Sequence, residues 1–179
     1  MCQPITLEQL LASRDARHAM QQSLIAAHPT LTLVCLTVVV PGSVKRNGQS
    51  LTVARAAVEA LRREFRPAEG MLTERDLTTG YEAYMLVQGT PEAVKRRTCR
   101  IEEEHPLGRL FDIDVIRPDG VPMTRAEVGG SARRCLVCGN DARYCMRLRQ
   151  HSQQDIWRRI DALVEHWRAA HGGAAAIET

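Results

Sequence analysis

The chain is poor in aromatic residues, which make up only 4% of its 179 residues. Proteins that stack the bases of single-stranded RNA need aromatic side chains gathered on one surface. No such cluster falls on the predicted strands, so the sequence argues against an RNA-binding platform. The net charge of +3 is also too small to indicate nucleic-acid binding by itself.

Long apolar segments are lacking as well. The longest apolar run, LTLVCLTVVV, is too short to span a bilayer, which takes about 20 residues. The first twenty residues carry charges where a signal peptide needs an apolar stretch. We therefore expect a soluble, cytoplasmic protein without a membrane partner. In that reducing compartment its six cysteines are expected to be thiols or metal ligands.

What is present is the composition of an ordinary globular domain, with 44% hydrophobic and 25% charged residues. Arginine clusters in three segments, VKRRTCR, SARRC and RYCMRLRQ. Local basic clusters favour binding of a polyphosphate or of an acidic protein, even where the net charge is small.

The order of predicted elements indicates an α+β fold. Helices are predicted over residues 7–27, 51–65, 91–104 and 152–170, the second capped by Ser50, and strands over 31–40, 71–78, 81–88 and 109–116. Residues 31–117 therefore give the order β-α-β-β-α-β, a split sandwich of ferredoxin-like or nucleotidyltransferase-like type. We expect a catalytic core over residues 1–128, preceded by its N-terminal helix. The Cys-rich helical extension, 129–179, is expected to pack on the same single domain.

Two aspartates stand one residue apart in the apolar segment GRLFDIDVI. In a strand, Asp112 and Asp114 project from one face, while Phe111, Ile113 and Val115 take the other. Adjacent carboxylates repel each other, so they must be solvated or neutralised. A Mg²⁺ ion that holds a phosphate is one such partner. The alternative is a sheet whose aspartate face lies in water.

The cysteines of CLVCGNDARYC, with His151 beyond them, have the spacing C-x2-C-x6-C-x5-H. Cys135, Cys138, Cys145 and His151 could close a tetrahedral zinc site. Two features argue against a zinc site. The second half of the motif lacks a matching cysteine pair, and Cys145 and His151 would lie on or beside one helix. The favoured interpretation is a turn of reduced cysteines with a structural role, and structural zinc is the other.

Three segments of the chain, taken together, resemble one enzyme family. VVVPGSVKRNG, HPLGRLFDIDVIRPDG and RRCLVCGNDARYCMRLRQHS occur in the order found in the citrate lyase holo-acyl-carrier-protein synthase family, also called apo-citrate lyase phosphoribosyl-dephospho-CoA transferase. The resemblance spans nearly the whole chain. It implies a nucleotidyltransferase that moves the prosthetic group from triphosphoribosyl-dephospho-CoA to a serine of the citrate lyase acyl carrier subunit, with release of pyrophosphate.

That chemistry suits the acidic pair and the cationic side chains near it. Asp112, Asp114 and Arg109 are the predicted catalytic residues, and the two aspartates are the predicted Mg²⁺ ligands. The residues predicted to bind the substrate are Gly42, Lys45, Gly108 and Arg134. A lone Lys45 or Arg109 could equally be a solvated surface charge.

The predicted partner is the acidic acyl carrier, which would meet the basic clusters around Arg96, Arg97, Arg143 and Arg147. Two alternatives remain open. One is the analogous transferase that loads the carrier protein of malonate decarboxylase. The other is a non-enzymatic zinc-knuckle module that binds nucleic acid.

Overall fold

Two compact units make up the chain, residues 1–131 and residues 132–179. The structure is a computed structural model that describes residues 3–65 and 71–171.

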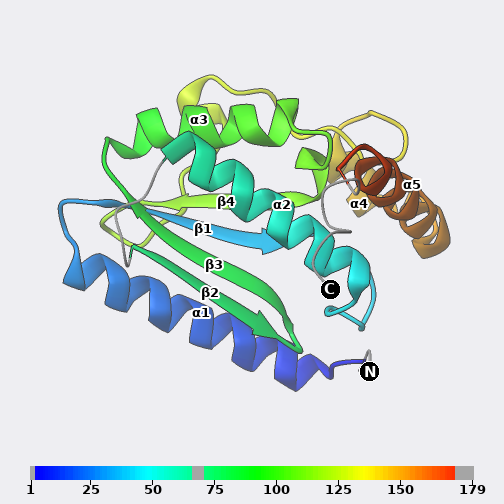
Figure 1. Cartoon of the computed structure of the whole chain (residues 1–179), viewed down its shortest axis with the longest axis horizontal. Helices are drawn as coiled ribbons and strands as arrows, with labels where there is room; N and C mark the ends of the chain where they lie inside the picture. Colours follow the sequence, from blue (N-terminus) through cyan, green and yellow to red (C-terminus); the bar gives the residue numbers. More distant parts are fainter. Residues whose placement is uncertain (1–2, 66–70, 172–179) are drawn as a thin grey trace, which may run out of the picture. The chain divides into compact units, whose positions relative to one another are not determined.

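The described residues of the first unit form a four-stranded antiparallel sheet with three α-helices (Figure 1). Its elements are α1 (Leu7–Ala27), β1 (Thr32–Val38), α2 (Gly48–Phe65), β2 (Leu72–Leu77), β3 (Gly80–Val87), α3 (Pro91–Glu104), the 3₁₀ helix η1 (Gly108–Leu110), β4 (Phe111–Ile116) and the 3₁₀ helix η2 (Ala126–Val128). The strands lie in the order β2-β3-β1-β4, and every neighbouring pair is antiparallel. The mixed α/β class and the order of strands and helices agree with the prediction.

Helices cover both faces of this sheet. The C-terminal half of α1 packs Met20, Leu24 and Ile25 on one face, against the apolar side chains of Leu33, Cys35, Tyr84, Leu86 and Ile116. On the other face α2 and α3 lie together, apart from α1 (Figure 1). There the alternate strand residues Val34, Leu36, Ala83, Met85, Ile113 and Val115 are at most 2% exposed. The sheet is therefore buried on both sides over much of its length.

Two buried charged side chains of α3 bind the backbone of Ile113 on the outer edge of β4. Glu102 Oε1 accepts a hydrogen bond from the Ile113 N–H over 2.9 Å, and Lys95 Nζ donates to the Ile113 carbonyl over 3.2 Å. Both side chains are at most 4% exposed. Arg125 also binds the Glu102 carboxylate, which ties the segment after β4 to the same helix. An edge strand would otherwise present these backbone groups to another chain.

Two elements start two or more residues away from their predicted positions. Asn47, not Ser50, caps α2: its Oδ1 accepts from the Ser50 N–H over 2.8 Å, and Ser50 Oγ accepts from the Asn47 N–H over 2.9 Å. This reciprocal pair satisfies two backbone donors at once, so the helix begins earlier than expected. The fourth strand begins at Phe111 rather than at residue 109, because η1 occupies the three residues before it.

In the second unit, residues 132–171 contain two helices, α4 (Ala142–Arg147) and α5 (Gln153–His171). Ser152 caps α5, where Ser152 Oγ accepts from the Asp155 N–H over 3.1 Å. Among its described residues, the buried apolar side chains are Cys145, Ile160 and Val164. On α5 the buried residues are thus Ile160 and Val164. Over residues 3–65 and 71–171, no helix has the length and apolar character needed to cross a membrane.

Replacement of Glu102 by Ala is expected to lower the free energy of unfolding by about 3–5 kcal/mol, because it removes the buried partner of Arg125 and the acceptor of the Ile113 N–H. Urea denaturation measures the effect. Glu104→Ala, an exposed change on the same helix, is the control and should cost less than about 0.5 kcal/mol. Equal stability of the two variants would show that Glu102 does not hold α3 on β4.

Candidate functional site

Asp112 and Asp114 project from the same face of β4, as their spacing predicts. Both are half-buried, whereas Ile113 between them is buried on the opposite face. Across the sheet, Asp112 lies opposite Thr37 and Asp114 lies opposite Cys35. The Thr37 hydroxyl donates to Asp112 Oδ2 over 3.2 Å. Because Cys35 belongs to the face under α1, the two carboxylates lie on that side of the sheet.

A third carboxylate on this face, Glu82 of β3, was not foreseen from the sequence. It lies opposite Thr37 and is almost fully buried. Arg17 Nε of α1 donates to Glu82 Oε1 over 3.0 Å, the Tyr84 hydroxyl donates to Oε2 over 2.7 Å, and Arg75 lies 3.7 Å from Oε2. Burial, together with the bond to Glu82, raises the pKa of Tyr84 well above its usual range. Glu82 thus links α1 to the sheet and β2 to β3 through its side-chain contacts.

Cys35 lies beside the acidic pair, where a thiolate could act as a nucleophile. Gln21 Nε2 of α1 donates to the Cys35 Sγ over 3.5 Å. Burial, reinforced by the Asp114 carboxylate, raises the pKa of Cys35 to about 12. Only a thiolate attacks efficiently, so this protonated thiol is not an activated nucleophile at neutral pH.

The antiparallel register brings several predicted site residues to one end of the sheet. The loop after β1 carries Gly42 and Lys45, and β4 begins opposite the last residue of β1. Gly108 and Arg109 therefore adjoin that same end, immediately before the acidic pair. The turn between β2 and β3 lies there as well.

The loop that carries Lys45 is held against the turn between β2 and β3. The Lys45 Cβ lies 3.8 Å from the position that a Cβ on Gly80 would take, and Lys45 Nζ donates to the Val40 carbonyl over 2.6 Å. Burial, with Arg14 nearby, lowers the pKa of Lys45. Gly42 has φ of 78°, a conformation that glycine adopts without strain. An ammonium has three N–H donors, of which the Val40 bond uses one.

Packing explains why residue 108 is glycine. A Cβ there would lie 2.5 Å from the Glu102 carbonyl oxygen at the end of α3, closer than any side-chain atom fits. Gly108 is buried, and Arg109 beside it in η1 is half-buried. The close approach of η1 to α3 therefore sets where β4 starts.

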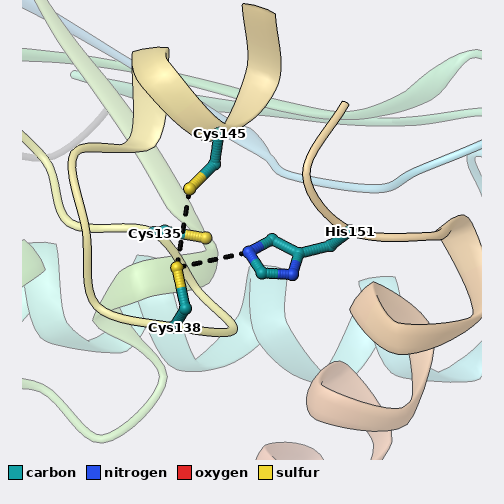
Figure 2. A group of neighbouring side chains, drawn as sticks. All are labelled: Cys135, Cys138, Cys145 and His151. Carbon is teal, nitrogen blue, oxygen red and sulfur yellow. Dashed lines mark hydrogen bonds between the residues drawn. The ribbon is translucent and has the colours of Figure 1, made fainter. Parts of the chain in front are cut away.

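The second unit brings all four candidate zinc ligands together (Figure 2). The Sγ atoms of Cys135, Cys138 and Cys145 and the ring nitrogen of His151 all lie within 4.8 Å of one another. Cys138 Sγ lies 3.5 Å from Cys145 Sγ and 3.2 Å from His151 Nε2. The sulfur atoms are not bonded, since a disulfide is about 2.05 Å long.

Local turns produce this convergence. After α4 the chain reverses at Arg149, the one described non-glycine residue with positive φ, at 47°. The Arg149 N–H donates to the Met146 carbonyl over 3.3 Å, and the Gln150 N–H donates to the Cys145 carbonyl over 3.0 Å. These two bonds form a Schellman motif. The motif returns His151 to the cysteines, which removes the geometric objection raised by a shared helix.

A second turn arranges the first two cysteines. The backbone N–H groups of Cys138 and Val137 donate to the Cys135 sulfur; although burial opposes it, these bonds and the neighbouring thiols lower the pKa of Cys135 to about 7. Gly139 closes the turn with φ of 75°. The exposed Arg134 side chain donates to the Gly139 carbonyl over 3.3 Å, so this predicted substrate-binding residue lies beside the cysteine turn.

Comparison with known proteins gives consistent results. A family model described as apo-citrate lyase phosphoribosyl-dephospho-CoA transferase matches residues 5–167. A protein of that name from Citrobacter koseri is 33% identical over 170 residues, covering 93% of this chain and 92% of the relative. A Vibrio cholerae protein, named as a probable enzyme of this kind, is 36% identical over 171 residues, covering 91% and 93%. An Escherichia coli relative is 33% identical over 163 residues, covering 89% and 88%.

Proposed function

Because the chain belongs to the apo-citrate lyase phosphoribosyl-dephospho-CoA transferase family, we propose that it attaches that prosthetic group to the acyl carrier subunit of citrate lyase. The donor is triphosphoribosyl-dephospho-CoA and the acceptor is a serine of the carrier. The observation that carries the proposal is a match over nearly the full length of this chain and of its relatives. The chain is therefore an enzyme, a transferase.

The transfer is a displacement at phosphorus. The serine oxygen bonds to the phosphorus next to the ribose, the bond from that phosphorus to the pyrophosphate oxygen breaks, and the hydroxyl proton is released. Pyrophosphate leaves with the bonding electrons. Negative charge thus builds on the leaving group, and catalysis depends on groups that stabilise that charge.

Asp112 and Asp114 supply the carboxylate oxygens that Mg²⁺ prefers, on one strand face and half-buried. They would hold the ion, which when bound compensates the charge of the donor's triphosphate. The Thr37 hydroxyl orients Asp112 through its hydrogen bond. The two aspartates fit Mg²⁺ in ligand type and in placement, because hard oxygen ligands on a rigid strand suit a small hard cation.

The cationic groups at the same end of the sheet would bind the phosphates. Lys45 supplies an ammonium from the loop after β1, and Arg109 supplies a guanidinium from η1, where it would clamp the leaving group. Gly42 and Gly108 contribute through backbone placement, since one turns the loop and the other lets η1 approach α3.

We propose further that the first unit is a ferredoxin-like split sandwich. Its β-α-β-β-α-β order and the strand order β2-β3-β1-β4 support this assignment, because each β-α-β crossover then skips one antiparallel strand.

The carrier is proposed to meet the exposed basic surface of α4. Arg143 and Arg147 are exposed there, beside the exposed apolar side chains of Tyr144 and Met146. Acyl carrier proteins are acidic, so opposite charge would speed the encounter. Arg97 fits this role less well, because Glu64 Oε1 already binds its guanidinium over 2.6 Å.

Incubation of the enzyme with donor, Mg²⁺ and apo carrier is expected to raise the carrier's mass by one phosphoribosyl-dephospho-CoA group, measured by intact mass spectrometry. The apo carrier of malonate decarboxylase serves as the second acceptor. Faster loading of the citrate lyase carrier supports the proposal. Unmodified citrate lyase carrier, with both reactants intact, would refute it.

Asp112→Asn and Asp114→Asn are each expected to lower the rate of carrier loading on the order of a hundredfold or more, through loss of a metal ligand. Their melting temperatures should stay equal or rise, since Asn relieves the repulsion between the carboxylates. Asp119→Asn, in the turn after β4, is the control and should load normally. Variants that unfold but keep full activity per folded molecule would make the carboxylates structural.

The rate of association with the carrier should fall about tenfold when Arg143 and Arg147 are both replaced by Glu, and should fall with added salt for the unmodified enzyme. Stopped-flow fluorescence at several salt concentrations measures both. The double replacement of Arg158 and Arg159 by Glu makes the same charge change on α5 and is the control. An association rate that changes neither with salt nor with the charge of α4 would show that the carrier does not bind at this surface.

A further inference from the structure

We propose that Cys135, Cys138, Cys145 and His151 bind one structural Zn²⁺ ion. The proposal concerns the second unit alone and does not rest on the transferase reaction. Its starting point is geometric, since four soft or borderline ligand atoms, from one turn, from α4 and from the segment after α4, converge within 4.8 Å (Figure 2). Three thiolates and one imidazole are among the ligand sets of structural zinc sites.

The distances match one ion at the centre of a tetrahedron. With Zn–S bonds of about 2.3 Å, the sulfur atoms of such a site lie about 3.8 Å apart. The Cys138–Cys145 separation is 3.5 Å and the Cys138–His151 separation is 3.2 Å. Ligand shifts below about 1 Å would complete the shell. An iron–sulfur cluster would spread its ligands around several metal ions, which this tight group does not do.

The local backbone is shaped for thiolate ligands. The N–H groups of Val137 and Cys138 point at the Cys135 sulfur, and they would compensate the charge of a metal-bound thiolate. The Schellman turn at Arg149 keeps a non-glycine residue in the left-handed region, at a cost of about 1–2 kcal/mol. That turn places His151, the one ligand that lies outside the cysteine segment.

The second unit also needs a stabilising element that its core does not supply. Its described part buries only three apolar side chains, one of them the ligand Cys145. A segment this short rarely folds around so small a core without a metal or a disulfide. Its cysteines are thiols, so a disulfide does not meet the need, and zinc would. All four ligands are from the protein, which leaves no open position, and the site is therefore structural rather than catalytic.

Elemental analysis of the full-length, untagged protein, purified without chelator, is expected to give about one zinc ion per chain. His151→Ala should reduce the zinc content or weaken binding by tenfold or more, whereas His166→Ala, an exposed histidine on α5, should leave it unchanged. If His151→Ala does not fold, the unmodified protein decides through Co²⁺ exchange. Tetrahedral thiolate-bound Co²⁺ gives intense visible bands and a charge-transfer band that octahedral Co²⁺ lacks.

Chelation of the metal should raise hydrogen exchange in residues 132–171 and leave the strands of the first unit protected. Protein with less than about 0.1 zinc per chain, whose native cysteines all titrate as accessible thiols, would overturn the proposal. A Cys138–Cys145 disulfide in the mass spectrum of the native protein, or an iron–sulfur absorption spectrum, would overturn it as well.

Discussion

The orientation of Asp112 and Asp114 depends on the hydrogen bonds made by the backbone of Ile113. Glu102 accepts from its N–H and Lys95 donates to its carbonyl, while the residues on either side of it are Asp112 and Asp114. A shift of the strand by one residue would turn every side chain to the opposite face. Two buried charges on α3 thus fix the register that keeps both carboxylates out of the core.

The face under α1 is divided along its length. Towards one end, the C-terminal half of α1 packs apolar side chains on the sheet. Towards the other, α1 makes polar contacts instead, as Arg17 binds Glu82 and Ser13 Oγ donates to Thr79 Oγ1 over 3.0 Å. This division explains the irregular apolar pattern of the helix, whose Leu7 and Leu11 are exposed. It also leaves the polar end of the face to Asp112 and its neighbours.

Much of this arrangement could be predicted, because its causes are local. The period-two pattern of FDIDV determines which side chains share a face, and the order of strands and helices follows from hydrophobic spacing and turn residues. What could not be predicted depends on contacts distant in sequence. Glu82 joined the site through its pairing with Thr37, and η1 replaced the first strand residues because Gly108 packs on α3.

The cysteine segment shows the same limit. Its spacing identified the four candidate ligands, but the apparent conflict between Cys145 and His151 assumed one continuous helix. The chain instead ends α4 at Arg147 and reverses through a left-handed residue that is not glycine, so composition gave no signal for the turn. Similarly, Asn47 rather than Ser50 caps α2 because the two residues form a reciprocal pair.

The order β2-β3-β1-β4 gives the sheet two chemically different borders. At β4 the backbone of Ile113 is already bonded to α3, so strand addition by another chain is blocked at that residue. At β2 the central residues are charged, and Arg62 and Arg46 hold Glu74 and Asp76 in ion pairs. Charged residues on a short edge strand discourage intermolecular pairing. The β4 border is therefore blocked at Ile113 by its bonds to α3, and the β2 border is protected by charge. Both features oppose aggregation through the sheet.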